Sequence, residues 1–573
     1  MSRYIGLPAS GGIAIGPAWV FRPQQVQVER TTVQDPAEEW ANLEVALAMA
    51  REQVQTLEKR AVEMAGPDEA AIFGAHLMFL DDEELLGSLR ELIINQRLNA
   101  KAAVQEAFNH YAEALLSLEE EYFKARAQDV SDVGQRVLRC LEGGQSQDSA
   151  VLSKPSVILA EDLAPSDTIG FERQNILGLA TVKGGPTSHT AILARALGVP
   201  AVVSVPLVLD EIQVETLLIL DGTQGEITIA PTLNELDIAR KRQEEWQARL
   251  QIELSRTHLP ASTKDGITVE VVANIGNTAD AALAIQQGAE GVGLFRTEFL
   301  YLDRDTLPTL NEQVQTYRQV FTVMQGKPVV VRTLDIGGDK AVSYLGVTAE
   351  PNPFLGWRAI RMIRDRPDVL ENQLSALLIA AGETRVDLRI MLPMVSTISE
   401  VERAREIFDS CCQALKNQSR PMPEKVQFGI MVEVPSAAVL ADQFAKVVDF
   451  FSIGTNDLTQ YTLAIDRTNE RVAGLASPYH PAVLRLIQYT IQAAHAEGKW
   501  VGLCGELAGD PQAVPFLLGA HLDEFSMAPS SIPTIKDTIR SWSLSACEEI
   551  AKTALQLPKA ADVIEYLKSV TAS

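Results

Sequence analysis

Cysteine is scarce in this chain of 573 residues, and its spacing excludes two common uses of the residue. The cysteines are Cys140, Cys411, Cys412, Cys504 and Cys547. An odd number with no Cys-x-x-Cys pair predicts neither a disulfide framework nor a zinc site. The chain also lacks an apolar run of about 18 residues, the length of a membrane span. Residues 1–6 lack the apolar segment of a signal peptide. We therefore expect no membrane insertion and a cytoplasmic protein.

Basic residues are outnumbered by acidic ones. There are 50 Lys and Arg against 75 Asp and Glu, which gives a formal net charge of −25. Because nucleic-acid binding requires a basic face, this balance argues against a nucleic-acid partner. Aromatic residues make up only 6% of the chain, whereas hydrophobic residues make up 46%, as in ordinary globular proteins. One core cannot accommodate a chain of this length, so we expect two to four domains.

Glycine is scarce between residues 35 and 141, where Ala, Leu, Glu and Gln dominate and apolar residues recur at helical spacing. This pattern predicts a block of several long helices. Residues 3–22 predict short β segments separated by glycine turns. Further strands are expected at 156–160, 176–182, 201–205, 217–221 and 226–229. A charged, glycine-free stretch at 233–254 predicts a solvated linker helix.

The remainder of the chain repeats a strand-then-helix rhythm. Eight strands are expected, at 267–273, 291–294, 328–334, 388–394, 428–433, 449–453, 500–503 and 522–526. Helical patterns lie between them, at 278–287, 312–324, 359–364, 398–414 and 481–496. Eight βα units of this size indicate a TIM barrel.

Residues 184–195 combine a strand-to-helix turn with a histidine. The segment reads Gly-Gly-Pro-Thr-Ser-His-Thr-Ala-Ile-Leu-Ala-Arg. At a helix start, free backbone N–H groups and the helix dipole favour an anion near His189. A neutral imidazole there is a nucleophile for a phosphoryl group. From residue types and spacing alone, a glycine-rich turn with an incidental capping histidine explains the segment equally well.

Charged and reactive side chains recur where the barrel strands end, the place of catalytic residues in this fold. They are Arg296, Arg332, Glu433, Asn456, Asp457, Arg467 and Cys504. Arginines bind carboxylate and phosphate groups, two carboxylates offer hard oxygens to Mg²⁺, and a thiol can deliver a proton. Each type also has a simpler explanation: salt bridges for the arginines, core packing for Cys504 and helix capping for Asp457.

Several longer segments carry a family resemblance. They are 71–76 (Ala-Ile-Phe-Gly-Ala-His), 293–300 (Gly-Leu-Phe-Arg-Thr-Glu-Phe-Leu), 332–340 (Arg-Thr-Leu-Asp-Ile-Gly-Gly-Asp-Lys), 352–358, 429–435, 452–461 and 502–506. Residues 184–195 resemble the phosphohistidine motif of the phosphoenolpyruvate (PEP)-utilising enzymes. The whole set, in order, resembles the enzyme I family of the PEP:sugar phosphotransferase system. Pro186 departs from the residue usual in that family.

The resemblance implies a role for each candidate residue. His189 would accept the phosphoryl group, and Cys504 would protonate enolpyruvate to give pyruvate. PEP would be bound by Arg296, Arg332, Asn456, Asp457 and Arg467. Mg²⁺ would be held by Glu433 and Asp457. The phosphoryl group would pass to a histidine of the carrier protein HPr, and a homodimer would form through the barrels.

Pattern and resemblance together predict a multidomain α/β protein. Residues 1–22 and 145–231 would form a β/α phosphohistidine domain that swivels, 23–144 a helical HPr-binding domain, 232–260 a linker helix and 261–573 a PEP-binding (βα)8 barrel. One alternative is a pyruvate phosphate dikinase or PEP synthase, but no P-loop precedes His189. Another is a non-catalytic PEP sensor, which the intact set of site residues argues against.

A stretch without Lys or Arg, residues 61–89, is the expected docking site for HPr. Its acidic residues are Glu63, Asp68, Glu69, Asp81, Asp82, Glu83 and Glu84, and the expected apolar patch comprises Ile72, Phe73, Leu77, Met78 and Phe79. An apolar patch ringed by negative charge suits a small partner with a basic rim. The alternative is a solvated helix end, with His76 packed in the core.

Overall fold

The computed structural model describes residues 2–22, 26, 28–64, 67–116, 121–143, 152, 154–163, 171, 173–185, 188–213, 215–302, 304, 306–337, 343–346, 350, 352–467, 469, 472 and 474–571. The chain divides into two compact units, residues 1–249 and 250–573. Within these ranges, the helices are too short or too polar to cross a membrane.

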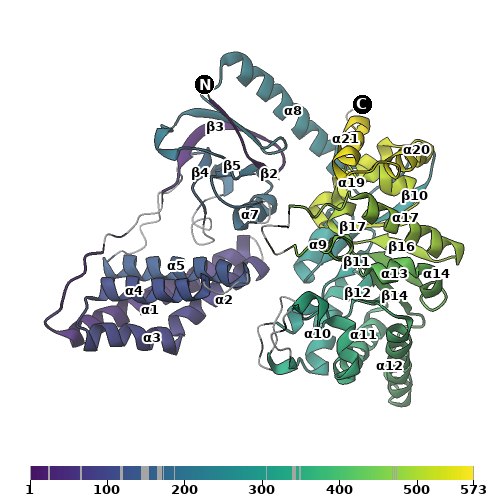
Figure 1. Ribbon diagram of the computed structural model, residues 1–573, viewed down its shortest axis with the longest axis horizontal. Helices are drawn as coiled ribbons and strands as arrows, with labels where there is room; N and C mark the ends of the chain where they lie inside the picture. Colours follow the sequence, from purple (N-terminus) through teal and green to yellow (C-terminus); the bar gives the residue numbers. More distant parts are fainter. Residues whose placement is uncertain are drawn as a thin grey trace. The chain divides into compact units, whose positions relative to one another are not determined.

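A helical block forms the first part of the N-terminal unit, as the scarcity of glycine predicts (Figure 1). Its helices are α1 (Pro36–Met64), α2 (Pro67–Asp81), α3 (Glu83–Arg90), α4 (Ala100–Leu116) and α5 (Glu121–Leu141). Their buried faces share one core that includes Leu43, Val54, Leu89, Phe108 and Val133. Asp82 begins α3, because its carboxylate accepts a hydrogen bond from the Leu85 amide at 2.8 Å.

A mixed eight-stranded sheet forms the second part of this unit. Its strands are β1 (Ser2–Ile5), β2 (Leu7–Ser10), β3 (Ile13–Val20), β4 (Ser156–Ala160), β5 (Ile176–Thr181), β6 (Ala201–Val203), β7 (Leu217–Asp221) and β8 (Glu226–Ile229). The spatial order is β1-β8-β7-β3-β4-β5-β6-β2, so strands from the first 20 residues lie among strands formed 130 or more residues later (Figure 1). The helix α8 (Leu233–Ser255) follows the sheet and lies where the charged stretch at 233–254 predicts a helix.

Eight parallel strands of the C-terminal unit close into a barrel. They are β10 (Thr268–Ile275), β11 (Val292–Phe295), β12 (Pro328–Arg332), β13 (Asp387–Leu392), β14 (Gln427–Val432), β15 (Phe450–Ile453), β16 (Trp500–Leu503) and β17 (Glu524–Met527). The pairing of β10 with both β11 and β17 completes the circle. The fold prediction is confirmed.

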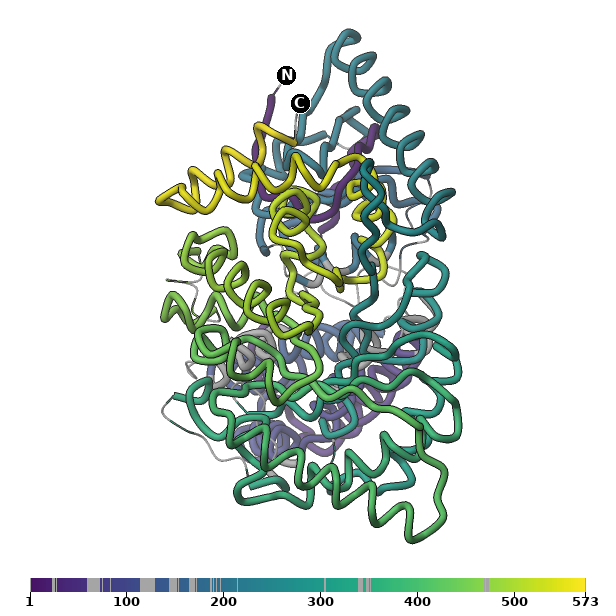
Figure 2. Tube along the Cα trace, turned by 90° about the vertical axis from the view of Figure 1, so that its right-hand side faces the viewer, coloured from purple at the N-terminus to yellow at the C-terminus, as the bar shows by residue number. Residues whose placement is uncertain are grey.

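Helices alternate with these strands along the chain. Figure 2 traces this unit by residue number, from teal to yellow. They include α9 (Thr278–Gln286), α10 (Leu310–Val323), α11 (Pro367–Thr384), α12 (Ile398–Asn417), α13 (Pro435–Val439), α14 (Ala441–Phe444), α15 (Thr455–Leu463), α17 (Pro481–Ala496), α18 (Val514–Gly519), α19 (Ile532–Ser541), α20 (Leu544–Ala554) and α21 (Ala560–Thr571). One expected helix differs: residues 359–364 form a 3₁₀ helix.

The barrel interior is a small apolar cluster. It comprises Leu294, Val330, Met391, Met431, Phe450 and Cys504. Trp500 stacks on Phe450 with ring centroids 4.6 Å apart. Because this cluster fills the barrel, the charged residues that follow the strands gather at its C-terminal end.

Candidate functional site

Arg332 ends β12 and is buried between two carboxylates. Its Nη2 donates to Glu298 Oε1 at 2.8 Å, and its Nη1 lies 3.1 Å from Asp335 Oδ2. Its Nε has no hydrogen-bond partner among the described residues. Arg296, directly after β11, has an exposed side chain. The salt-bridge explanation therefore holds for the two Nη atoms of Arg332, and its Nε remains a donor without an acceptor among the described residues.

Arg358 lies in the loop after β12 and binds Asp335 with two parallel hydrogen bonds, Nε to Oδ1 at 2.8 Å and Nη2 to Oδ2 at 2.9 Å. The backbone around this pair is constrained. A Cβ at Gly337, where φ is +108°, would lie 2.5 Å from the Trp357 carbonyl oxygen. Ala359 has a φ of +52°, a conformation that costs free energy for any residue with a side chain. This loop is therefore shaped to hold Arg358 in place.

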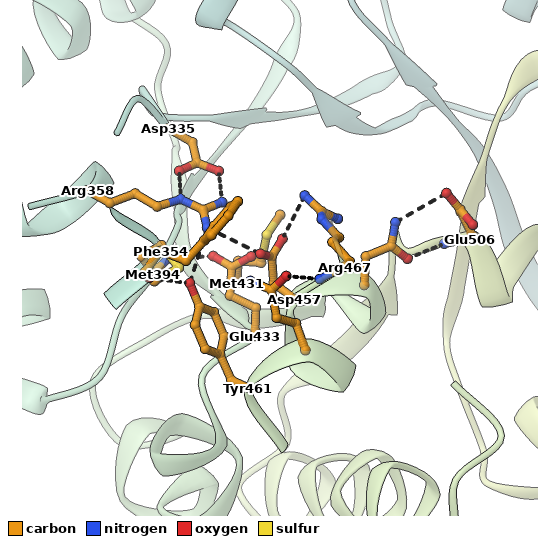
Figure 3. A network of polar contacts seen from close by, with 12 residues as sticks. Asp335, Phe354, Arg358, Met394, Met431, Glu433, Asp457, Tyr461, Arg467 and Glu506 are labelled. Atoms are coloured by element: carbon orange, nitrogen blue, oxygen red, sulfur yellow. Dashed lines mark hydrogen bonds and ion pairs between the residues drawn. The ribbon is translucent and has the colours of Figure 1, made fainter. Parts of the chain in front are cut away.

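Asp457 contacts two arginines, Arg358 and Arg467 (Figure 3). It lies in the first turn of α15, where its Oδ1 accepts a hydrogen bond from Arg358 Nη1 at 3.2 Å. Its Oδ2 lies 3.9 Å from Arg467 Nη2. The helix begins after Gly454 without a side-chain cap, so the capping explanation for Asp457 is not supported. Tyr461, one turn later, also accepts from Arg358 Nη1 at 3.2 Å.

Glu433 directly follows β14 and is 1% exposed. Its Oε1 accepts a hydrogen bond from the backbone amide of Met394 at 2.5 Å, and Met394 adopts a φ of +58° to present that amide. Its Oε2 has no hydrogen-bond partner among the described residues. Burial, followed by the nearby charges of Asp457 and Asp335, raises the pKa of Glu433 to about 8.

Asn456 and Glu506 connect the loops after β15 and β16. Asn456 Nδ2 donates to Glu506 Oε1 at 3.4 Å, and the Glu506 amide donates to Asn456 Oδ1 at 3.3 Å.

Cys504 follows β16, is 5% exposed and donates to the Ile453 carbonyl at 3.7 Å. Burial raises the pKa of its thiol to about 11, so the thiol is protonated near neutral pH. Cys504 is thus both a core residue and a potential proton donor.

The structure brings three predicted residues of the barrel into one network of polar contacts. Arg332, Asp457 and Arg467 are linked through Asp335 and Arg358. Glu433 lies close enough for the charges of Asp457 and Asp335 to raise its pKa. Sequence reasoning did not assign roles to Glu298, Asp335, Arg358 or Tyr461, although all four stand in segments that carried the resemblance. For the three charged residues, the signal available in the sequence was a charged side chain inside such a segment.

His189 belongs to the other unit and is the first residue of α7 (His189–Leu197). Its side chain, and residues 186 and 187, lie outside the described part of the chain. The turn before it requires glycine, because Gly184 has a φ of +91° and a Cβ there would lie 3.1 Å from Ser188 Oγ. The predicted strand, glycine turn and helix start are therefore present around His189.

The expected docking segment is only partly on the surface. Met78 of α2 is 74% exposed and Glu84 of α3 is exposed, but Phe73 is completely buried, so its assignment to an exposed patch was wrong. Phe73 faces inward because α2 packs against α1 and α5. His76 is also fully buried, with Nε2 3.7 Å from Asp129 Oδ1. Side chains of residues 59–72 lie outside the described set.

A cavity of about 500 Å³ opens at the other end of the barrel, away from this network. Residues at the beginnings of the strands line it, among them Glu270, Arg389, Trp500 and Glu524. Glu524 is 1% exposed, and burial raises its pKa to about 8. Arg389 Nη1 lies 3.7 Å from Glu524 Oε2 and 3.8 Å from Glu270 Oε2. Because TIM-barrel chemistry takes place at the C-terminal face, we assign this cavity no role in the site.

Comparison with known proteins gives matches along the whole chain. Three family models match: the N-terminal region of PEP-utilising enzymes at residues 5–126, their mobile domain at 152–225 and their PEP-binding domain at 251–544. The phosphoenolpyruvate-protein phosphotransferase of Geobacillus stearothermophilus is 46% identical over 563 residues, which cover 98% of this chain and 97% of the relative. That of Bacillus subtilis is 42% identical over 568 residues, 99% of each chain.

These relatives match in full length as well as in sequence, which favours the phosphotransferase prediction over the dikinase alternative. The matched mobile domain contains the turn before His189, and the matched PEP-binding domain contains the barrel network. The chain belongs to the enzyme I family, the phosphoenolpyruvate-protein phosphotransferases among the PEP-utilising enzymes.

Proposed function

We propose that this chain transfers the phosphoryl group of PEP to His189 and from there to a histidine of HPr, yielding pyruvate. The observation that carries the proposal is the convergence of four arginines with two carboxylates at the C-terminal end of the barrel. The arginines are Arg296, Arg332, Arg358 and Arg467, and the carboxylates are Glu433 and Asp457. Forked guanidinium groups bind phosphate and carboxylate oxygens, and PEP carries both groups.

Arg296, Arg332 and Arg467 hold PEP and stabilise the charge that develops during transfer, while Arg358 orients Asp457. Arg332 Nε, buried and without a partner in the described structure, is a donor available to a substrate oxygen. Asn456, Asp457, Arg296 and Arg467 complete the binding site. Because phosphoryl transfer has a loose transition state, positioning and electrostatics supply most of the catalysis. The phosphoryl–oxygen bond of PEP breaks as a bond forms to the His189 imidazole nitrogen.

Glu433 and Asp457 fit the requirements of Mg²⁺. Glu433 Oε2 is a buried hard oxygen without a hydrogen-bond partner, and such an oxygen suits a divalent cation. The protein would supply these two carboxylates, and Mg²⁺ in proteins usually keeps several waters among its other ligands. Bound Mg²⁺ would neutralise negative charge on the phosphoryl group.

Cys504 supplies a proton to the enolate that remains. The enolate keeps the oxygen that bridged to phosphorus, and its terminal carbon takes the thiol proton as the carbonyl of pyruvate forms. Solvent then reprotonates the thiolate. A pKa of about 11 keeps Cys504 protonated until the enolate, a stronger base at carbon, is present.

Further parts of the proposal concern partners and organisation. Residues 23–144 would bind HPr. Residues 1–22 and 145–231 would carry His189 between the barrel site and HPr, and residues 232–260 would link them to the barrel at 261–573. The boundary near residue 144 falls outside the described residues. The enzyme would act in the cytoplasm as a homodimer joined through the barrels. Sedimentation of the purified chain over a concentration range tests the dimer.

The deciding experiment maps the phosphoryl group. The wild-type protein and His189→Ala are incubated with Mg²⁺ and PEP labelled in its phosphate, and the labelled peptide is identified. We expect acid-labile, base-stable label on His189 and none on the variant, while HPr becomes labelled only with wild type. Label on another histidine in the variant would refute the assignment of His189.

A further inference from the structure

Gln373 is a buried amide of α11 that uses every polar atom of its side chain. It is completely buried. Its Oε1 accepts from the Leu334 amide at 2.9 Å. Its Nε2 donates to Thr297 Oγ1 at 3.0 Å and to Tyr317 Oη at 3.1 Å. A buried amide is stable only when its groups are hydrogen-bonded, so these three contacts define one position for the side chain.

Two of these contacts lie among the charged residues of the site. Thr297 stands between Arg296 and Glu298, directly after β11, and Leu334 stands between Arg332 and Asp335, directly after β12. Thr297 Oγ1, which accepts from Gln373, donates in turn to the Arg332 carbonyl at 2.9 Å. Gln373 therefore connects the two strand ends both directly and through Thr297.

Backbone pairing does not continue as far as these residues. The parallel ladder between β11 and β12 is irregular after Val292 and ends where Phe295 pairs with Val331. Beyond that point, the described contacts that join the strand ends are made by side chains, namely Thr297 to the Arg332 carbonyl and Arg332 to Glu298. Beyond the end of the ladder, the side-chain amide of Gln373 also connects the two strands, through Leu334 and Thr297.

We propose that Gln373 is a positioning residue that sets the spacing between Arg296 and Arg332 for PEP. The inference rests on the proposed function of the barrel site. Gln373 touches no reacting group and acts only through Thr297 and Leu334. Because a displacement of about 1 Å in a catalytic group can cost about 100-fold in rate, a lost spacer has a measurable effect on the PEP step.

The test compares Gln373→Met with Tyr317→Phe in the full-length protein. Methionine keeps the volume of the side chain but removes all three hydrogen bonds. Tyr317→Phe removes one acceptor of the same amide and leaves both strand contacts in place. With HPr and Mg²⁺ present, we expect Gln373→Met to raise the KM for PEP and lower kcat/KM by about 10- to 100-fold. Tyr317→Phe is expected to stay within about threefold of wild type, and the KM for HPr is expected not to change in either variant.

Thr297→Val tests the proposal independently, because it removes the hydroxyl that Gln373 contacts. Thr297→Ser, which keeps the hydroxyl, is its control. If Gln373 acts through Thr297, then Gln373→Met and Thr297→Val together should lower kcat/KM for PEP by no more than about threefold beyond the worse single variant. Thr297→Ser should be close to wild type. Should Gln373→Met fail to fold, the contrast between Thr297→Val and Thr297→Ser decides the same question.

Failure of the proposed function and failure of the inference about Gln373 give different experimental results. A wild-type protein that is not phosphorylated by PEP refutes the proposed function and the inference together. Normal wild-type turnover with an unchanged kcat/KM in Gln373→Met refutes the inference alone. Fully additive losses in the double variant, or equal losses for Gln373→Met and Tyr317→Phe, also refute it, because they indicate only a loss of packing.

Discussion

The carboxylate of Asp335 holds the guanidinium of Arg358 with two nearly equal hydrogen bonds, at 2.8 and 2.9 Å, and leaves its third nitrogen for Asp457 at 3.2 Å. All three side chains are buried. Residues 358 and 457 are 99 positions apart in the chain. The pair therefore connects the loop after β12 to α15, and it fixes the orientation of a carboxylate proposed to bind Mg²⁺.

Arg358→Lys should disable the site although it preserves the charge. Lysine cannot reproduce the bidentate contact, because its ammonium is a point charge without a fork. We expect kcat/KM for PEP to fall by about 100-fold, equivalent to about 2.7 kcal/mol of transition-state stabilisation. The matched control is Arg366→Lys, because Arg366 makes the same two-bond contact with Asp368 on the exposed surface. Equal effects of both substitutions would contradict a specific role for Arg358.

The strands of the barrel were accessible from sequence because they are short apolar runs, most of them separated by helical patterns. Each end of the eight predicted strands falls within two residues of the observed one, and β16 agrees at both ends. The 3₁₀ helix at Ala359–Arg364 was not accessible, because its geometry depends on Arg358 being drawn toward Asp335 and on Ala359 in the left-handed region. Both are consequences of long-range contacts rather than of local propensity.

Cys504→Ser tests the proton donor. The hydroxyl preserves the size of the side chain but is a much weaker acid than a thiol. We expect conversion of PEP to pyruvate to slow by about 100-fold or more, the scale for a lost general acid, while PEP binding measured calorimetrically changes little. Cys547→Ser is the control, since Cys547 is also completely buried and burial raises its thiol pKa to about 12. Normal turnover in Cys504→Ser would leave Cys504 a core residue only.

Glu524 makes the stability of the barrel depend on pH. Burial raises its pKa from 4.5 to about 8, with Arg389 opposing and Glu270 and Asp523 reinforcing the shift. The folded state therefore holds a proton that the unfolded state releases above pH 4.5. This contribution to stability is complete below pH 4.5 and is lost as the pH rises toward and through 8.

Glu524→Gln removes that titration. Between pH 5.5 and 8.5, wild type should lose stability relative to the variant, by at most about 1.4 kcal/mol per pH unit for one proton. Thermal unfolding at several pH values measures the difference. Glu549→Gln, on the exposed surface of α20, should follow wild type throughout. Parallel curves for wild type and Glu524→Gln would mean that Glu524 is ionised in the folded protein.

The members of the site could be predicted from sequence better than their connections could. Arg332, Glu433, Asp457 and Cys504 follow strands that the apolar pattern located, so their shared position was inferable. Asp335 was not assigned, because a carboxylate in a long loop resembles a solvated residue until Arg358 is seen against it. Phe73 illustrates the converse: α2 is apolar around much of its circumference, so the sequence did not indicate which side faces α5.

Met78→Asp tests the docking of HPr on the helical block. Met78 is an exposed apolar residue beside the acidic segment at residues 81–84. A charge introduced there, at the centre of the proposed docking surface, would have to be desolvated when HPr binds. We expect the KM for HPr to rise by about 10-fold or more, consistent with the loss of a central apolar contact. Phosphorylation of His189 by PEP should continue at the wild-type rate, because it requires the barrel and not this surface. Val45→Asp is the matched control, since Val45 is 62% exposed on α1 and outside the acidic segment. If HPr transfer is unchanged in Met78→Asp, or falls equally in Val45→Asp, the docking surface lies elsewhere.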